Sequence, residues 1–342
     1  MTDIIIRKDG AAGRITLNRP EALNSLTEGM LQAIDGALTA WETDPDVALV
    51  MIDAAGDRAF AAGGDIVDLY ESGRAGNFAF GQRFWAFEYQ LNARIARYPK
   101  PYVAFMHGFV MGGGVGVSAL GSHRIVCETT QVAMPECGIG LVPDVGGSKL
   151  LADAPGRCGE YLGMTGARMG PADAIYAGFA DIYVPEAEWE TLKARLVEAG
   201  DVGAIAKAAK APGSGGLAGA QPQIDEAFSA ASAVEVEAAL VAIPTPWAVA
   251  TVKALRKGCP LSVATAMQMI RAAREMSLEE ALAQEYRFTA RCMEYGEFLE
   301  GIRAAVIDKD RKPQWAKPSL AKISAADIDA MLAPLGGSEL EI

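Results

Sequence analysis

Two glycine turns and a few carboxylates are the residues of this chain that could act together on a carbonyl group. The pair Gly63 and Gly64 follows an apolar run in AFAAGGDI, and a triple glycine that includes Gly113 ends another apolar run. Glycine leaves a backbone N–H open to a ligand because it carries no side chain. Two such N–H groups aimed at one point would form an oxyanion site, and a nearby carboxylate would supply an acid or base. This combination suits chemistry on an acyl group.

Three carboxylates lie in apolar stretches of the sequence, where an unpaired charge would be costly. Glu136 follows Met-Pro in AMPECGIGL, so it is either an ordinary turn residue or a base tuned by partial burial. Asp144 lies in VPDVGG, where an Asx-type turn is the alternative to a role in a site. Glu88 lies among the aromatic residues of an expected helix. An unpaired carboxylate would be costly there, so Glu88 either has a partner or belongs to a site.

Several other functions are disfavoured by what the sequence lacks. It contains no G-x-S-x-G, H-E-x-x-H or G-x-x-x-x-G-K-[ST] pattern, which argues against a serine hydrolase, a zinc protease and a P-loop enzyme. The formal charge of −12 disfavours a nucleic-acid partner. No apolar run approaches the roughly 20 residues that a membrane span needs. The two histidines, His107 and His123, are interpreted as structural residues.

The expected location is the cytoplasm. The N-terminal sequence enters strand-like alternation directly and shows no signal-peptide features. The five cysteines include no C-x-x-C spacing, which favours reduced, buried thiols over a disulfide framework or a zinc site. We therefore expect an ordinary soluble enzyme without a structural metal.

The elements that must position these residues alternate between strands and helices in the first half, which predicts an α/β core. Strands are expected over residues 4–6, 14–17, 47–52, 102–106, 123–127 and 132–134, and helices over 26–41, 82–97 and 112–120. Thr27 is the expected N-cap of the first helix. The third helix would place Gly113 at a helix N-terminus, where N–H groups are open.

The second half is predicted to be helical. From about residue 191 the sequence is rich in alanine, and a Gly/Ser/Pro-rich stretch at residues 211–222 is interpreted as a flexible surface loop. Ser277 and Glu280 form a capping-box pattern before a helix over residues 278–293. We expect an α/β core domain over residues 1–190 and a helical C-terminal region over residues 191–342.

Over nearly its whole length the chain resembles the crotonase (enoyl-CoA hydratase/isomerase) superfamily and, within it, the 3-hydroxyisobutyryl-CoA hydrolase branch. The segments that carry the resemblance are ITLNRPEALNSL, AFAAGGDI, FEYQLNARIARYPKPYVAFMHGFVMGGGVGVS, AMPECGIGLVPDVGG, SLEEALAQEYR and EGIRAAVIDKDRKPQW. The family implies a spiral of ββα-type turns with a C-terminal helical layer, and a CoA thioester as the ligand.

The resemblance also implies roles for individual residues. By position, the N–H groups of Gly64 and Gly113 match the family's oxyanion hole, and Glu136 matches its catalytic glutamate. Asp144 matches the aspartate that is typical of the hydrolase branch, and Glu88 matches a glutamate of the acyl pocket. Whether Glu136 would act as a general base or attack the carbonyl itself is left open by the sequence.

Two positions depart from what relatives carry. Gly116 stands where hydratases have a second catalytic glutamate, and Glu21 stands where many relatives have a lysine that can face the nucleotide of CoA. Backbone groups remain available for the substrate around four residues, Ala22, Leu23, Ala61 and Ala62. Loss of the second glutamate favours thioester hydrolysis, because adding water to a double bond calls for a carboxylate pair.

We therefore expect an acyl-CoA hydrolase that acts on a short branched 3-hydroxyacyl-CoA. An enoyl-CoA isomerase or hydratase, and a non-catalytic acyl-CoA-binding protein, are the alternatives. The resemblance implies no metal and no redox cofactor, since coenzyme A is part of the substrate. Relatives often form trimers, but the C-terminal helices could cover the same surface and leave a monomer.

Overall fold

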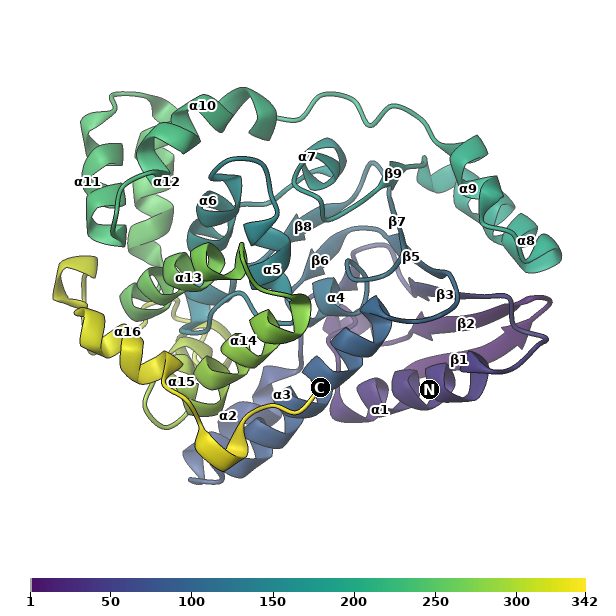
Figure 1. Ribbon diagram of the computed structural model, residues 1–342, viewed down its shortest axis with the longest axis horizontal. Helices are drawn as coiled ribbons and strands as arrows, with labels where there is room; N and C mark the ends of the chain where they lie inside the picture. The colour runs from purple at the N-terminus through teal and green to yellow at the C-terminus, as the bar shows by residue number, and fades with distance from the viewer. Residues whose placement is uncertain (1) are drawn as a thin grey trace. The chain divides into compact units, whose positions relative to one another are not determined.

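The computed structural model describes residues 2–342 (Figure 1), and internal contacts divide the chain into two compact units. Unit 1 comprises residues 1–64, 91–133 and 168–218, and unit 2 comprises residues 65–90, 134–167 and 219–342. The contacts therefore group the chain differently from the expected division at residue 190, which falls inside the last segment of unit 1. The reason is that residues 134–167 pack with the C-terminal helices of unit 2.

Unit 1 contains two β-sheets. The larger has the strand order β1-β2-β3-β5-β7-β9, in which β1 and β2 form an antiparallel hairpin and the other neighbours are parallel. The smaller has three parallel strands in the order β4-β6-β8. The strands are β1 Ile4–Asp9, β2 Ala12–Leu17, β3 Leu49–Ala54, β4 Ala59–Ala61, β5 Tyr102–Met106, β6 Phe109–Met111, β7 His123–Val126, β8 Gln131–Ala133 and β9 Ile182–Tyr183. All five residues of β5 are buried, as expected for a parallel strand covered on both faces.

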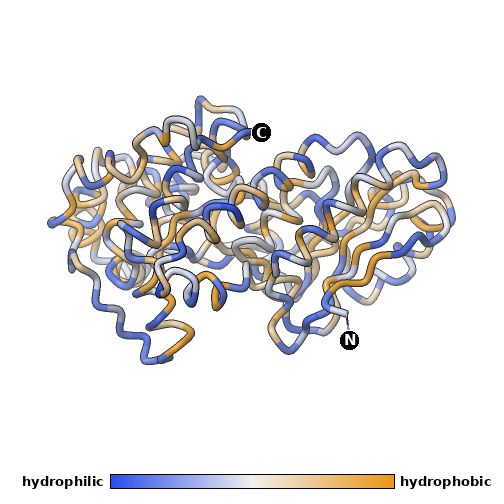
Figure 2. The backbone as a smooth tube through the Cα atoms, turned by 90° about the horizontal axis from the view of Figure 1, so that it is seen from below, coloured by the Kyte–Doolittle hydropathy of each residue, from blue (hydrophilic) through white to orange (hydrophobic). Residues whose placement is uncertain are grey.

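Helices complete unit 1. They are α1 Glu28–Glu42, α4 Gly113–Gly116, α7 Pro171–Tyr176, α8 Trp189–Ala199 and α9 Gly203–Ala208. The predicted N-cap of α1 is confirmed, because the Thr27 side chain accepts a hydrogen bond from the Met30 amide at 3.2 Å. In the core, apolar residues of β3, β5 and β7 pack against Trp189, Leu192 and Leu196 of α8. Figure 2 shows orange, apolar stretches in the part of the backbone drawn near the N-terminus.

Unit 2 is predominantly helical. Its helices are α2 Ile66–Arg74, α3 Phe78–Ala96, α5 Gly147–Ala152, α6 Cys158–Thr165, α10 Leu217–Phe228, α11 Ala233–Ala242, α12 Pro246–Lys257, α13 Pro260–Ala273, α14 Leu278–Cys292, α15 Phe298–Ile302 and α16 Ala325–Leu332. Residues 91–96 of α3 and 217–218 of α10 belong to unit 1. Helix α13 is its centre and contacts α5, α6 and α14. The predicted capping box is confirmed at α14, where Ser277 and Glu280 exchange hydrogen bonds of 3.2 and 2.8 Å.

Among the predicted boundaries that are wrong, three concern the helices and the loop. The helix expected over residues 112–120 ends at Gly116, since a glycine-rich segment has low helix propensity. Helix α3 begins at Phe78, four residues before its expected start. The stretch 211–222 is irregular only as far as Gly216, because α10 begins at Leu217. The Asp173 carboxylate fixes that start by accepting from the Gly216 and Leu217 amides at 3.2 and 2.8 Å. None of the helices over residues 2–342 has the length and hydropathy of a membrane span.

Candidate active site

In unit 1 the fold brings the two predicted glycine turns together. One follows β4 and the other follows β6, and these strands are parallel neighbours, so their carboxyl ends meet at the same edge. A Cβ atom placed on Gly63 would lie 4.0 Å from the Gly113 nitrogen. Gly63 has φ of +106° and Gly112 has φ of +50°, a backbone region that side chains rarely adopt. Glycine is therefore required for the turns to approach each other in this way.

The amides of Gly64 and Gly113 are free to bind a ligand. Within residues 2–342 neither amide donates a hydrogen bond to the protein. For Gly113 this follows from its place at the first position of α4, where no preceding turn offers an acceptor. Gly114 needs to be glycine for a different reason, since a Cβ there would lie 2.6 Å from the Ala61 carbonyl oxygen. The predicted donors are thus near neighbours in unit 1, held by backbone geometry alone.

The four residues expected at the nucleotide end of CoA also lie in unit 1. Leu23 has φ of +53°, and its carbonyl oxygen accepts from the Ala62 amide at 3.0 Å, which ties the loop to the end of β4. Asn24 is buried and donates to the Ala55 and Ala59 carbonyls at 2.9 and 2.8 Å. The Ala22 and Leu23 amides donate inside their own turn. This loop can provide carbonyl oxygens and a packing surface to a ligand. It stays a prediction that a nucleotide contacts Ala22, Leu23, Ala61 and Ala62.

In unit 2 the three predicted carboxylates gather in one buried cluster. Glu136 begins a short 3-10 helix, η2 (Glu136–Ile139), Asp144 lies in the turn before α5, and Glu88 lies on α3. Their exposed fractions are only 5%, 4% and 3%. Within residues 2–342, Glu136 Oε2 and Glu88 Oε1 have no hydrogen-bond partner. An unpartnered buried carboxylate oxygen is costly, so these atoms fit a ligand better than a purely structural role.

Tyr89 and Glu285 complete the cluster. The Tyr89 hydroxyl donates to Asp144 Oδ2 at 2.6 Å. Glu285, on α14, accepts from the Gly146 amide at 2.8 Å, from the Ser148 amide at 2.9 Å and from the Ser148 hydroxyl at 2.5 Å. It therefore caps α5 and holds the turn that carries Asp144. Neither residue was predicted from the sequence, although Glu285 is a charged residue between Leu282 and Phe288 on the buried face of its helix, which is a usable signal.

Burial and mutual repulsion raise the pKa values of these acids. Burial raises the pKa of Glu136 well above its usual range, and the charges of Asp144, Glu285 and Glu88 add to the rise. Burial raises the pKa of Asp144 to about 7, against the opposing effect of the Tyr89 hydrogen bond. Burial likewise raises the pKa of Glu285 to about 8, and the donors around Ser148 and Gly146 oppose this. The acids titrate as a group, so the cluster keeps protons near neutral pH and Glu136 is a stronger base than a free glutamate.

Several residues that could have belonged to a site are structural. The Asp65 side chain caps α2 by accepting from the Val67 amide. His107 is buried and packs edge-on against Trp189, and burial lowers its pKa. The five cysteines are all free and buried. Over residues 2–342 no group of three or more His, Cys, Asp or Glu side chains is arranged to hold a metal ion.

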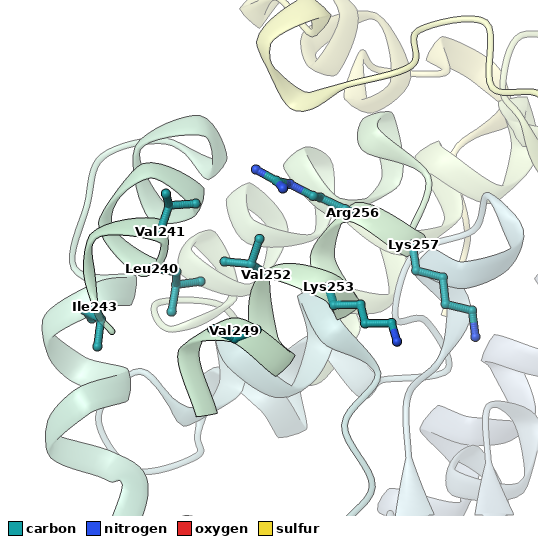
Figure 3. Close-up of a pocket in the computed structure, with 8 residues that line it drawn as sticks. All are labelled: Leu240, Val241, Ile243, Val249, Val252, Lys253, Arg256 and Lys257. Atoms are coloured by element: carbon teal, nitrogen blue, oxygen red, sulfur yellow. The ribbon is translucent and has the colours of Figure 1, made fainter. Parts of the chain in front are cut away.

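A surface cavity of about 550 Å³ lies apart from the predicted site residues, at α11 and α12 (Figure 3). It is lined by Leu240, Val241, Ile243, Val249, Val252, Lys253, Arg256 and Lys257. Its aliphatic floor and basic rim contain no carboxylate that could act as a base. The chemistry therefore belongs to the glycine turns and the acid cluster rather than to this cavity.

Comparison with known proteins places these features in a family. The sequence profile of the enoyl-CoA hydratase/isomerase family matches residues 12–332. Among curated proteins, the chain is 38% identical to the mitochondrial 3-hydroxyisobutyryl-CoA hydrolase of Danio rerio, over 100% of this chain and 92% of that protein. It is 35% identical to the protein of the same name from Gallus gallus, over 99% of this chain and 91% of that one.

Solved structures match over the whole chain. One, described as an enoyl-CoA hydratase from Rhodobacter sphaeroides, is 51% identical, with a TM-score of 0.96 and full coverage of both chains. Another, described as a carnitinyl-CoA dehydratase from Mycobacterium thermoresistibile, is 41% identical, with a TM-score of 0.95, over 100% of this chain and 99% of that one. The expected α/β fold of the crotonase type is confirmed. The descriptions of these relatives share a CoA thioester and differ in the reaction.

Proposed function

Because the chain belongs to the enoyl-CoA hydratase/isomerase family, we propose that it hydrolyses the thioester of 3-hydroxyisobutyryl-CoA. The products are 3-hydroxyisobutyrate and CoA, which assigns the reaction to valine breakdown. Full-length relatives that carry the name of this hydrolase support the proposal. The observation that carries it is the pairing of Glu136, which has a free buried oxygen, with Asp144 in one acid cluster.

The amides of Gly64 and Gly113 are assigned to the thioester carbonyl oxygen. Both are free donors, and backbone donors need no reorganisation when negative charge develops on that oxygen. Each such donor is typically worth roughly 3 kcal/mol of transition-state stabilisation. Polarisation of the carbonyl therefore requires no side chain from unit 1.

Glu136 is assigned to the step that breaks the thioester, by one of two routes. As a general base it takes a proton from water, the water oxygen attacks the carbonyl carbon, and the C–S bond breaks as the proton passes to the CoA thiolate. As a nucleophile its carboxylate attacks the same carbon, expels the thiolate and forms an anhydride that water then cleaves. Both routes require ionised Glu136, and its raised pKa makes that form a stronger base while reducing the fraction that is ionised.

Asp144 is assigned to the 3-hydroxyl group of the substrate or to the attacking water. It is buried at 4% exposure, and Tyr89 donates to only one of its carboxylate oxygens, Oδ2. The other oxygen can accept from a hydroxyl or from water. Glu88 is assigned to the wall of the acyl pocket, where its unpartnered Oε1 can meet a polar group of the substrate.

Hydration of an enoyl-CoA is the second candidate, because a solved structure that is 51% identical is described as a hydratase. Hydration calls for two carboxylates to position water and move its protons. Gly116 supplies none at the position where hydratases carry the second glutamate. An isomerase would need only one glutamate, and the VPDVGG setting of Asp144 disfavours it. The unpartnered Oε2 of Glu136, beside Asp144, disfavours a protein that only binds acyl-CoA.

An acyl-CoA panel tests the proposal directly. Purified protein is mixed with 3-hydroxyisobutyryl-CoA, isobutyryl-CoA and crotonyl-CoA, while free thiol is followed with DTNB and the enoyl absorbance is followed in parallel. Rapid thiol release from 3-hydroxyisobutyryl-CoA is expected. Loss of enoyl absorbance without thiol release would support the hydratase instead, and binding without either change would support a non-catalytic protein.

The proposal includes turnover without a metal or redox cofactor, because two backbone amides can polarise the carbonyl as a metal ion would. Dialysis against EDTA should leave kcat unchanged within error, and a loss restored by a divalent cation would contradict this.

The assembly is proposed to be a trimer or a monomer, which sedimentation mass distinguishes. The proposed location is the cytoplasm. The curated relatives are named as mitochondrial, and cell fractionation decides between the two.

A further inference from the structure

The turn that carries Asp144 has an unusual backbone. Val145 has φ of +56° and Gly146 has φ of +82°, and the Gly147 amide donates to the Asp144 carbonyl at 2.7 Å. Two successive left-handed residues closed by this bond form a type I′ turn. A β-branched residue such as Val145 is a rare occupant of that region, so the surrounding structure must hold the turn in place.

Glu285 is the residue that holds it. Both of its carboxylate oxygens are used, Oε2 by the Gly146 amide and Oε1 by the Ser148 amide and hydroxyl. Gly146 is the N-cap of α5 and has no side chain to cap the helix itself, so the cap comes from a residue 139 positions away. Gly146 is two residues after Asp144, and the Gly147 amide closes the turn on the Asp144 carbonyl, so the cap holds the backbone that carries the Asp144 carboxylate.

A second buried glutamate in unit 2 shows what a purely stabilising role looks like. Glu160 is also fully buried, and it pairs with Arg157, Arg271 and Arg274 at 2.8, 3.4 and 3.0 Å. Within residues 2–342, Glu285 makes no such ion pair and has only neutral donors. A carboxylate buried without a cation is costly, and an amide could satisfy part of the same cap. This cost is understandable if the cap serves the reaction.

We infer that Glu285 is a positioning residue for Asp144, acting through the Gly146 and Ser148 cap. The inference rests on the proposed hydrolysis, in which Asp144 contacts the 3-hydroxyl or the attacking water. Glu285 itself contacts no reacting atom. Its loss should therefore lower kcat by displacing Asp144, and the loss should disappear when Asp144 can no longer do its work.

A double-mutant cycle with 3-hydroxyisobutyryl-CoA tests the inference. Glu285→Gln keeps the shape but leaves one donor of the cap facing an amide N–H. It should lower kcat about tenfold with KM changed less than about twofold. In the Asp144→Asn background the same substitution should lower kcat by less than about a further twofold. Interactions that act as a unit give this non-additive pattern.

Two further variants keep the test decisive. Glu160→Gln is the matched control: it should lower the melting temperature through lost ion pairs while kcat stays within about twofold of wild type. If Glu285→Gln does not fold, Ser148→Ala removes only the hydroxyl donor at 2.5 Å. It should lower kcat about threefold, again only when Asp144 is intact.

The outcomes separate this inference from the function on which it rests. Unchanged kcat in a folded Glu285→Gln or Ser148→Ala protein would overturn the inference. It would also be overturned if the two single losses in kcat multiplied in the double variant. A wild-type protein that releases no CoA from 3-hydroxyisobutyryl-CoA would overturn the proposed function itself, and the inference with it.

Discussion

Unit 1 provides backbone amides that can bind a reacting group, whereas unit 2 provides buried side-chain acids. The free donors of unit 1 are Gly64 and Gly113, whose turns require glycine only because of backbone shape and close approach. The acids of unit 2, with Glu136 at their centre, have raised pKa values because burial and repulsion act on them together. One half of the proposed chemistry therefore depends on conformation and the other half on charge. Substitutions should therefore affect the two units in different ways.

Removing the charge of Glu136 should have the largest effect. Glu136→Gln keeps the size of the side chain and removes the base or nucleophile, so kcat should fall at least about a hundredfold while substrate still binds. The melting temperature should not fall, because one buried carboxylate fewer repels Asp144. A DTNB assay measures kcat, and thermal unfolding measures the melting temperature. Near-normal turnover in the folded variant would contradict the role of Glu136.

Removing a donor from unit 1 should have the next largest effect. Gly113→Pro deletes one amide N–H and should lower kcat/KM about a hundredfold, in the range known for single oxyanion donors. The variant also restricts the backbone at the start of α4, so circular dichroism must first show a native spectrum. A loss below about tenfold in a folded variant would mean that Gly113 is not a donor to the oxyanion.

Changing Asp144 to Asn distinguishes two roles of the acid cluster. If Asp144 binds the 3-hydroxyl, kcat/KM should fall about ten- to a hundredfold with 3-hydroxyisobutyryl-CoA and little with isobutyryl-CoA, because only the first substrate has the group. If it holds the water, both substrates should lose equally. Undiminished turnover of both would leave Asp144 as a plain turn residue, and the proposed substrate would broaden to short acyl-CoA thioesters.

The smallest effect concerns stability and pH, and it should come from unit 2. Asp144 and Glu285 have pKa values of about 7 and about 8 in the folded protein, against usual values of 3.8 and 4.5. The folded state thus binds more protons than the unfolded state between about pH 4 and about pH 8, and stability falls as pH rises through that window. The melting temperature should be several degrees lower at pH 8.5 than at pH 6.

Asp144→Asn provides the control for this pH dependence. It removes one of the acids whose pKa is raised, so its melting temperature should depend less steeply on pH than that of wild type. Equal slopes for the two proteins would locate the dependence elsewhere in this acidic chain.

Local patterns in the sequence predicted much of this molecule. The glycine turns follow apolar runs as expected, although the short strands β4 and β6 that these runs form were not predicted. The caps at Thr27 and Ser277 were visible from residue type and spacing alone. The placement of Glu136 and Asp144 came from family resemblance, and the structure puts both in one acid cluster. The contacts of Glu285 were not predictable in this way, because its partners lie 137 and 139 positions away. The side chain of Tyr89 reaches Asp144 across 55 positions, and no periodic pattern encodes such a distance.

The segmented division of the chain also sets an order of events during synthesis. The last residue of unit 1 is Ala218, so every strand of both sheets has been synthesised before α11–α16 are made. Glu285 follows Ala218 by 67 residues (285 − 218), which at about 5–20 residues per second is a delay of about 3–13 s. During that delay the nascent chain carries the Asp144 turn without its cap. The turns of Gly64 and Gly113, the proposed oxyanion donors, can therefore form during translation, whereas the cap on the Asp144 turn must wait for α14.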